Sequence, residues 1–132
     1  MRQKLQAPID EIAFLMEAGM VYRDAHEFKE AETVFRGVRE LLPSSEVPDV
    51  ALGTLRFESG DLPGAIKLYQ QAIEKNPQSA YAHSHLGEAH VFLRQPKEAR
   101  EHLQRALALD PRGESGKFAR GMMELLGIVE RG

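Results

Sequence analysis

Four of the five histidines lie near one another in the sequence, and imidazole nitrogens are common metal ligands and acid–base groups. His83, His85 and His90 fall on one expected helix, and His102 falls on the next. A helical zinc site uses two histidines four residues apart, so that both face one side. His83 and His90 are instead two turns apart, roughly 10 Å along the axis, and His85 points elsewhere. We therefore expect these rings to pack between helices, with no metal and no cofactor.

Other candidate chemistry is weaker still. Residues 113–117 read GESGK, which has the composition of a phosphate-binding loop. The glycine spacing is too short, no Ser or Thr follows the lysine, and no strand precedes the segment. The carboxylates are spread along expected helix surfaces, and no nucleophile stands beside a base. There is no cysteine, which excludes a thiolate nucleophile. We expect that the protein is not an enzyme.

Composition narrows the class of partner. The 20 acidic residues outnumber the 17 basic ones, for a net charge of -3, and the two signs are interspersed. Binding to a nucleic-acid backbone needs a clustered positive field, so a nucleic-acid partner is not expected. No apolar run is long enough for a signal peptide or a membrane span, which predicts no membrane insertion and a cytoplasmic location.

The elements that position any site follow one spacing of 34 residues. Glycine, alanine and proline each recur at this period, and two further columns hold apolar residues in the same register. The columns are Gly19, Gly53 and Gly87; Ala31, Ala65 and Ala99; Pro43, Pro77 and Pro111; Phe35, Tyr69 and Leu103; and Val38, Ala72 and Ala106. A fixed period of this length indicates one supersecondary unit copied three times.

Each copy is expected to be a helical hairpin. A glycine inside a helix costs ~1 kcal/mol relative to alanine, so three glycines at one spacing imply a shared packing reason. One hairpin cannot bury its own apolar face, so the copies should stack. Near the end of the chain, an apolar stripe predicts a last helix over 114–130 that covers the third hairpin.

The chain resembles the tetratricopeptide repeat. The Leu-Gly pair of that family is matched by Ala18-Gly19, Leu52-Gly53 and Leu86-Gly87. Its alanine, aromatic and proline columns match well, but the turn glycine is kept only in the middle copy, at Gly60. The resemblance implies an all-α fold: a right-handed α-solenoid of three helical-hairpin repeats (12–45, 46–79 and 80–113) with a C-terminal capping helix, in a single domain over 1–132.

The resemblance also implies a binding surface, because the first helix of each repeat lines the concave face. Its inward positions and the peptide-binding residues expected there are Met16, Met20 and Arg23; Val50, Thr54 and Phe57; and Tyr81, Ser84, Glu88 and Val91. Methionine and aromatic side chains suit the docking of apolar peptide side chains. Packing between neighbouring helices explains the same residues equally simply, and both interpretations stay open at this point.

The expected function is that of a non-enzymatic module that binds a peptide segment of a protein partner in an apolar groove. One subtype of the family holds a peptide's C-terminal carboxylate with Lys and Asn, but Met16 and Met20 stand at those positions, which argues against that clamp. A narrower similarity is to the tetratricopeptide chaperones of bacterial type III secretion. The alternative is a scaffold or oligomerisation subunit, including a homodimer.

Overall fold

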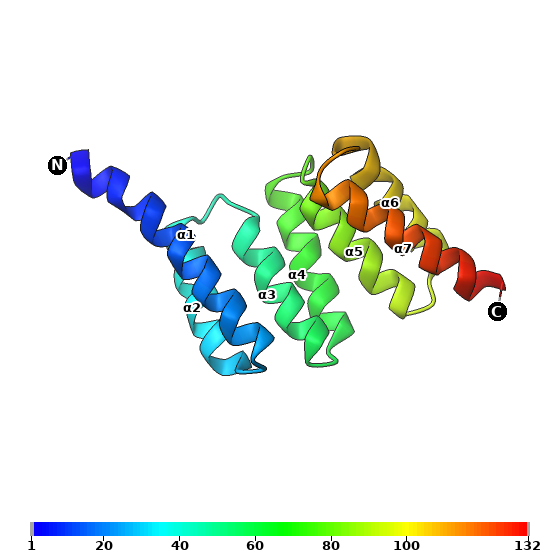
Figure 1. Ribbon diagram of the computed structural model, residues 1–132, viewed down its shortest axis with the longest axis horizontal. Coiled ribbons are helices and arrows are strands. Elements are labelled where there is room, and N and C mark those ends of the chain that lie inside the picture. Colours follow the sequence, from blue (N-terminus) through cyan, green and yellow to red (C-terminus); the bar gives the residue numbers. More distant parts are fainter. Residues whose placement is uncertain (1, 132) are drawn as a thin grey trace. The chain divides into compact units, whose positions relative to one another are not determined.

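The computed structural model describes the backbone of residues 2–131 and the side chains of residues 10–131. Over this part of the chain there are seven helices and no strand, which confirms the all-α prediction (Figure 1). The helices are α1 (Arg2–Asp24), α2 (Phe28–Leu41), α3 (Val47–Glu58), α4 (Leu62–Lys75), α5 (Ala80–Phe92), α6 (Pro96–Leu109) and α7 (Glu114–Arg131).

The helices fall into two compact units, and the prediction of a single domain stays a prediction. Unit 1 is Met1–Ser44 and unit 2 is Ser45–Gly132. In unit 1, α1 packs against α2, which buries one face of α2. That face consists of Ala31, Phe35 and Val38, three of the residues that the 34-residue spacing singles out.

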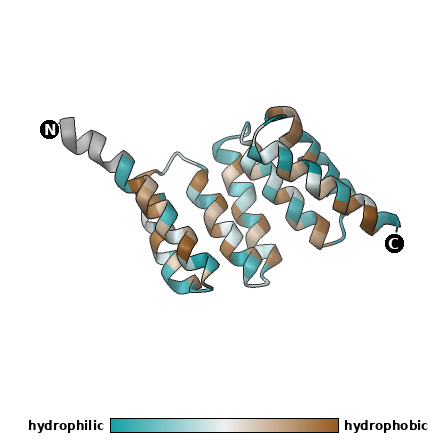
Figure 2. Cartoon of the chain, in the orientation of Figure 1, coloured by the Kyte–Doolittle hydropathy of each residue, from teal (hydrophilic) through white to brown (hydrophobic). Residues whose placement is uncertain are grey.

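Unit 2 contains two helical hairpins and a final helix. The pairs α3–α4 and α5–α6 each pack as a hairpin, and α7 packs against both α5 and α6. Contacts also join α3 to α5, so α3, α5 and α7 form one layer, and α4 and α6 form the second. Hydrophobic and hydrophilic residues alternate along these helices, as expected for helices with one buried face (Figure 2).

The repeated glycines face the large residues of the next helix. A Cβ at Gly53 would overlap the ring of Tyr69, and a Cβ at Gly87 would lie 2.6 Å from Leu103. Tyr69 and Leu103 are fully buried, so the side chain of the second helix lies directly on the glycine of the first. This is the shared packing reason that the spacing predicts.

The turn inside each hairpin keeps a left-handed residue even where its glycine is lost. Gly60 has φ +90°, while His26 and Arg94, one period away on either side, have φ 63° and 58°. In each turn the backbone N–H of this residue donates to a carbonyl three residues earlier, at 2.9–3.1 Å. The same turn is therefore built three times, twice with a residue that adopts this conformation at a cost.

Candidate functional site

One face of α5 carries four partly accessible side chains in a line. Tyr81, His85, Glu88 and Phe92 are spaced by four, three and four residues, which places them on one side of the helix. We call these four residues the α5 stripe. They lie beside α3 and α7, the two helices that share a layer with α5. Two pockets open along this face, one near each end of the stripe.

The first pocket lies between the start of α5 and the start of α7 and has a volume of about 180 Å³. We call it the aromatic pocket because three rings meet there. The His85 ring is edge-on to Tyr81 at 5.1 Å between centroids, and it is 5.0 Å from Phe118 of α7. The lining residues are Tyr81, Ser84, His85, Glu114, Ser115 and Phe118.

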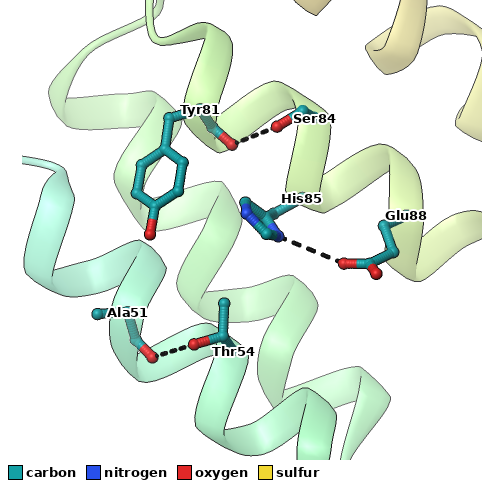
Figure 3. Close-up of polar contacts among 6 residues, drawn as sticks. All are labelled: Ala51, Thr54, Tyr81, Ser84, His85 and Glu88. Carbon is teal, nitrogen blue, oxygen red and sulfur yellow. Dashed lines mark hydrogen bonds and ion pairs between the residues drawn. The ribbon is translucent and has the colours of Figure 1, made fainter. Parts of the chain in front are cut away.

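The polar groups of this region are already bonded within the chain (Figure 3). Ser84 donates its hydroxyl hydrogen to the Tyr81 carbonyl oxygen at 2.9 Å. His85 Nδ1 lies 3.3 Å from a carboxylate oxygen of Glu88. On α3, the Thr54 hydroxyl donates to a backbone carbonyl at 2.7 Å in the same way. The side chains therefore hold each other in place.

The second pocket lies between the end of α5 and the C-terminal half of α7 and has a volume of about 300 Å³. We call it the apolar pocket; it is lined by Val91, Phe92, Arg94, Leu125 and Val129. Phe92 is 53% exposed and packs edge-on against Phe57 of α3, with ring centroids 5.2 Å apart. A phenylalanine this exposed, beside a further apolar surface, marks a site that a partner could cover.

The expected binding residues fall into three groups: those in unit 1, those buried in unit 2 and those partly accessible in unit 2. Met16, Met20 and Arg23 lie in unit 1, where Met20 is 37% exposed and Arg23 pairs with Asp24 at 3.3 Å.

In unit 2, four of the expected residues are buried: Val50, Thr54, Ser84 and Val91. Val50 belongs to the core cluster around Tyr69 and Leu86, so at these positions the packing interpretation describes the structure. Phe57, Tyr81 and Glu88 are partly accessible and lie along the face between α3 and α5. The peptide-binding assignment itself stays a prediction.

Three residues of this face were missed as binding residues: His85, Phe118 and Phe92. Tyr81, Glu88 and Phe92 correspond to Val47, Thr54 and Glu58 one period earlier, and His85 corresponds to Ala51. Three of these four columns change from a smaller or charged side chain to a ring. That change within the repeat is the signal that could have indicated the stripe.

A stack of histidines lies on the other side of α5, against α6. His83 Nδ1 and His102 Nδ1 are 3.0 Å apart, and His83 Nε2 lies 3.0 Å from the Pro77 carbonyl oxygen. The His90 ring stacks on His102 with centroids 5.9 Å apart. Burial lowers the pKa of His83, and the nearby Arg105 lowers it further. Burial also lowers the pKa of His102, helped by His83 and His90.

This stack matches the expectation of packed rings between helices. A carbonyl oxygen only accepts, so Nε2 of His83 carries its hydrogen and Nδ1 of the neutral ring accepts from His102. Among the residues whose side chains are described, no group of three or more His, Cys, Asp or Glu residues could hold a metal ion.

The backbone of the GESGK segment is hydrogen-bonded to a carboxylate that precedes it in the sequence. The backbone N–H groups of Gly113 and Ser115 both donate to the Asp110 carboxylate, at 2.9 and 3.2 Å. Asp110 thus takes the donors that a phosphate loop would offer to its ligand.

In the described part of the chain, no helix is both long enough and apolar enough to cross a membrane.

Two family models match unit 2. One, the TPR repeat, covers residues 53–91, and the other, the tetratricopeptide repeat, covers residues 80–112. Residues 53–112 therefore match the tetratricopeptide repeat. The matched tetratricopeptide repeats include all of the α5 stripe, whereas Phe118 and the α7 side of both pockets lie beyond them.

Solved tetratricopeptide-repeat structures share the fold, while no curated protein matches the chain. The first TPR of Spaghetti (RPAP3), bound to an HSP90 peptide, is 21% identical, covering 89% of this chain and 94% of that one, with a TM-score of 0.71. PcrH from Pseudomonas aeruginosa is 20% identical over 89% and 92%, with a TM-score of 0.75. The Yersinia enterocolitica chaperone SycD, in complex with a peptide of the translocator YopD, is 18% identical over 92% and 95%, with a TM-score of 0.73.

Proposed function

We propose that this protein is a non-enzymatic interaction module that holds an extended peptide segment of a partner protein along the α5 stripe. The observation that carries the proposal is the exposed Phe92, which lines the apolar pocket and packs against Phe57. An apolar side chain of the peptide would enter this pocket and cover the exposed ring, which removes apolar surface from water.

The spacing of the two pockets suits an extended chain. His85 of the aromatic pocket and Phe92 of the apolar pocket are seven residues apart on α5. That separation is roughly 10 Å along the helix axis, which three residues of an extended peptide would span. Tetratricopeptide domains of similar fold have been solved with peptides of HSP90 and of a translocator, and this supports the same class of ligand here.

The experiment is selection from a displayed library of random twelve-residue peptides, followed by affinity measurement for the enriched sequences. Phe92→Glu places a charge in the apolar pocket and should weaken binding at least about tenfold, because a carboxylate would be desolvated there. Ile128→Glu is the matched control, since Ile128 is 58% exposed on α7 and lines neither pocket. Circular dichroism should show equal helicity for both variants.

Two outcomes contradict the proposal. Failure to enrich any peptide would remove peptide binding altogether. Equal loss of affinity in Phe92→Glu and Ile128→Glu would place the peptide elsewhere. Light scattering on the free protein tests the alternative role as an oligomerisation subunit. A dimer that Phe92→Glu converts to a monomer would mean that a second copy covers the apolar pocket.

A secretion-chaperone role is the narrower form of this proposal. Its support is the likeness in fold to SycD, which was solved with a translocator peptide. If the role is correct, coexpression should keep an otherwise insoluble partner segment in solution, and Phe92→Glu should abolish that effect. Unchanged solubility of the segment with wild type would exclude the chaperone role and leave peptide binding intact.

A further inference from the structure

We propose that the aromatic pocket receives a basic side chain, arginine or lysine, of the bound peptide. The inference rests on the proposed function and adds a specificity to it. The pocket volume of about 180 Å³ lies below the ~300 Å³ at which pockets for drug-sized ligands begin, so it suits one side chain. Its rings and its polar groups together select the charge of that side chain.

The walls of the pocket suit a cation. Tyr81 and Phe118 approach the central His85 ring from α5 and α7, and both line the pocket. The face of an aromatic ring carries partial negative charge and attracts a guanidinium or ammonium group placed over it. The ring contacts also fix the walls before a ligand arrives, which lowers the entropy cost of binding.

Two carboxylates, Glu114 in the lining and Glu88 bonded to His85, supply groups that only accept hydrogen bonds. The Ser84 hydroxyl is buried and donates its hydrogen to the Tyr81 carbonyl oxygen, so its bond holds the pocket wall in place. His85 Nδ1 lies 3.3 Å from a carboxylate oxygen of Glu88, which holds this carboxylate at the edge of the pocket. Arginine and lysine carry only donors, and therefore complement this arrangement better than an acidic or neutral side chain does.

Among the described residues that line the aromatic pocket, the Asp, Glu, Lys or Arg side chain is a carboxylate. Glu114 lines the pocket from the first turn of α7, and Glu88 lies beside it through its bond to His85. Lys117, the nearest lysine in the sequence, lies about 100° round the helix from Phe118 and does not line the pocket. Arg94 carries a positive charge and lines the apolar pocket, at the other end of the stripe. The two pockets thus differ in charge, and a peptide would bind in one register.

The test is to repeat the peptide selection with wild type and with the double variant Glu88→Gln/Glu114→Gln. Peptides selected by wild type should share an arginine or lysine about three residues from an apolar residue. The double variant should lose the basic preference and keep the apolar one. Glu124→Gln is the matched control, because it removes the same charge from an exposed position of α7 outside both pockets.

Affinities then measure the effect. Replacing an arginine of a selected peptide by citrulline, or a lysine by norleucine, removes the charge at similar length and should weaken binding to wild type about tenfold. The same replacement should matter much less in the double variant and should keep its full effect in Glu124→Gln. If the double variant loses helicity, Glu114→Gln alone serves, because Glu114 is exposed.

The outcomes separate this inference from the proposed function. Selected peptides that share an apolar residue but no basic one would overturn the inference. They would leave the proposed peptide binding along the α5 stripe intact. A basic preference that survives in the double variant would also overturn it, because the cation would then be recognised elsewhere. If wild type enriches no peptide, the proposed function fails first, and the inference falls with it.

Discussion

The two hairpins of unit 2 bury a polar side chain at the same position of the repeat but give it different polar partners. Asp49 of α3 and His83 of α5 are 34 residues apart, at the same position of the repeat, and both are buried. In the α3–α4 hairpin, the carboxylate of Asp49 lies 2.6 Å from Lys75 Nζ. In the α5–α6 hairpin, the His83 ring bonds to the His102 ring and to a backbone carbonyl.

This difference shows that the repeat requires a close approach of its two helices but does not require one particular buried polar pair. The repeat demands a close approach of the two helices, since both hairpins place a buried side chain on a glycine. It tolerates different buried polar groups at this position when each finds a partner on the second helix, because a buried polar group is most costly when it stays unbonded. One hairpin therefore depends on an ion pair, and the other depends on two imidazoles that share a hydrogen bond.

The largest expected effect comes from filling the close approach in each hairpin. Gly53→Ala should cost about 2–3 kcal/mol in the free energy of unfolding, because the new methyl group overlaps the rigid, buried ring of Tyr69. Gly87→Ala should cost less, about 1 kcal/mol, since its nearest neighbours, Cγ and Cδ2 of Leu103 at 2.6 Å, belong to a side chain that can change rotamer, and the Ala99 carbonyl oxygen lies further away at 3.3 Å. Urea denaturation measures both values. Equal costs would mean that backbone movement, rather than the facing side chain, decides the outcome.

A smaller effect should follow from acid, and it should act on one hairpin. The pKa values of His83 and His102 are lowered below the ordinary 6.5, chiefly by burial, so the unfolded chain binds protons more readily than the folded one. Stability from these rings is complete above about pH 6.5 and is lost as the pH falls from there toward the folded pKa values. For each ring, the loss cannot exceed about 1.4 kcal/mol per pH unit.

Urea denaturation at several pH values checks this prediction, with His102→Gln for comparison. A glutamine amide can still donate to Nδ1 of His83 but does not titrate, so the fall in stability below pH 6.5 should be shallower in this variant. His90 and Glu101 face His102, and Arg105 faces His83; these groups stay the same in both proteins. Identical pH dependence in the two proteins would place the acid sensitivity outside the histidine stack.

The hairpins themselves were predictable because each follows from a local pattern repeated three times. The glycine columns predict close approach, whereas the identity of the facing residues, those of the Phe35 column, comes from the structure. The prolines and the turn residues bound the helices, and the turn persists at His26 and Arg94 without glycine. Repetition makes such inferences strong, because each column is tested more than once within one chain.

The proposed binding face was less predictable because it follows where the repeats differ. Val50 and Ser84 stand at expected inward positions, yet Val50 is 0% and Ser84 1% exposed. A shift of one residue along a helix turns a side chain by about 100°, so a register taken from a family pattern separates buried from accessible residues poorly. Ser84 and His85 both line the aromatic pocket, but His85, one residue later, is the more accessible of the two. Phe118 lies beyond the third repeat, where the pattern gives no register.

The smallest expected effect comes from a glycine that belongs to neither hairpin. Gly121 lies inside α7, and a Cβ there would meet nothing within 4 Å. Gly121→Ala should therefore stabilise the protein by up to about 1 kcal/mol, since alanine restricts the unfolded chain and favours the helix. The expected change in the free energy of unfolding has the opposite sign to that for Gly53→Ala, although both substitutions add one methyl group to a helix. A thermal melt that shows Gly121→Ala to be destabilising would mean that an α7 glycine, too, is kept for packing, and the contrast between hairpin glycines and others would fail.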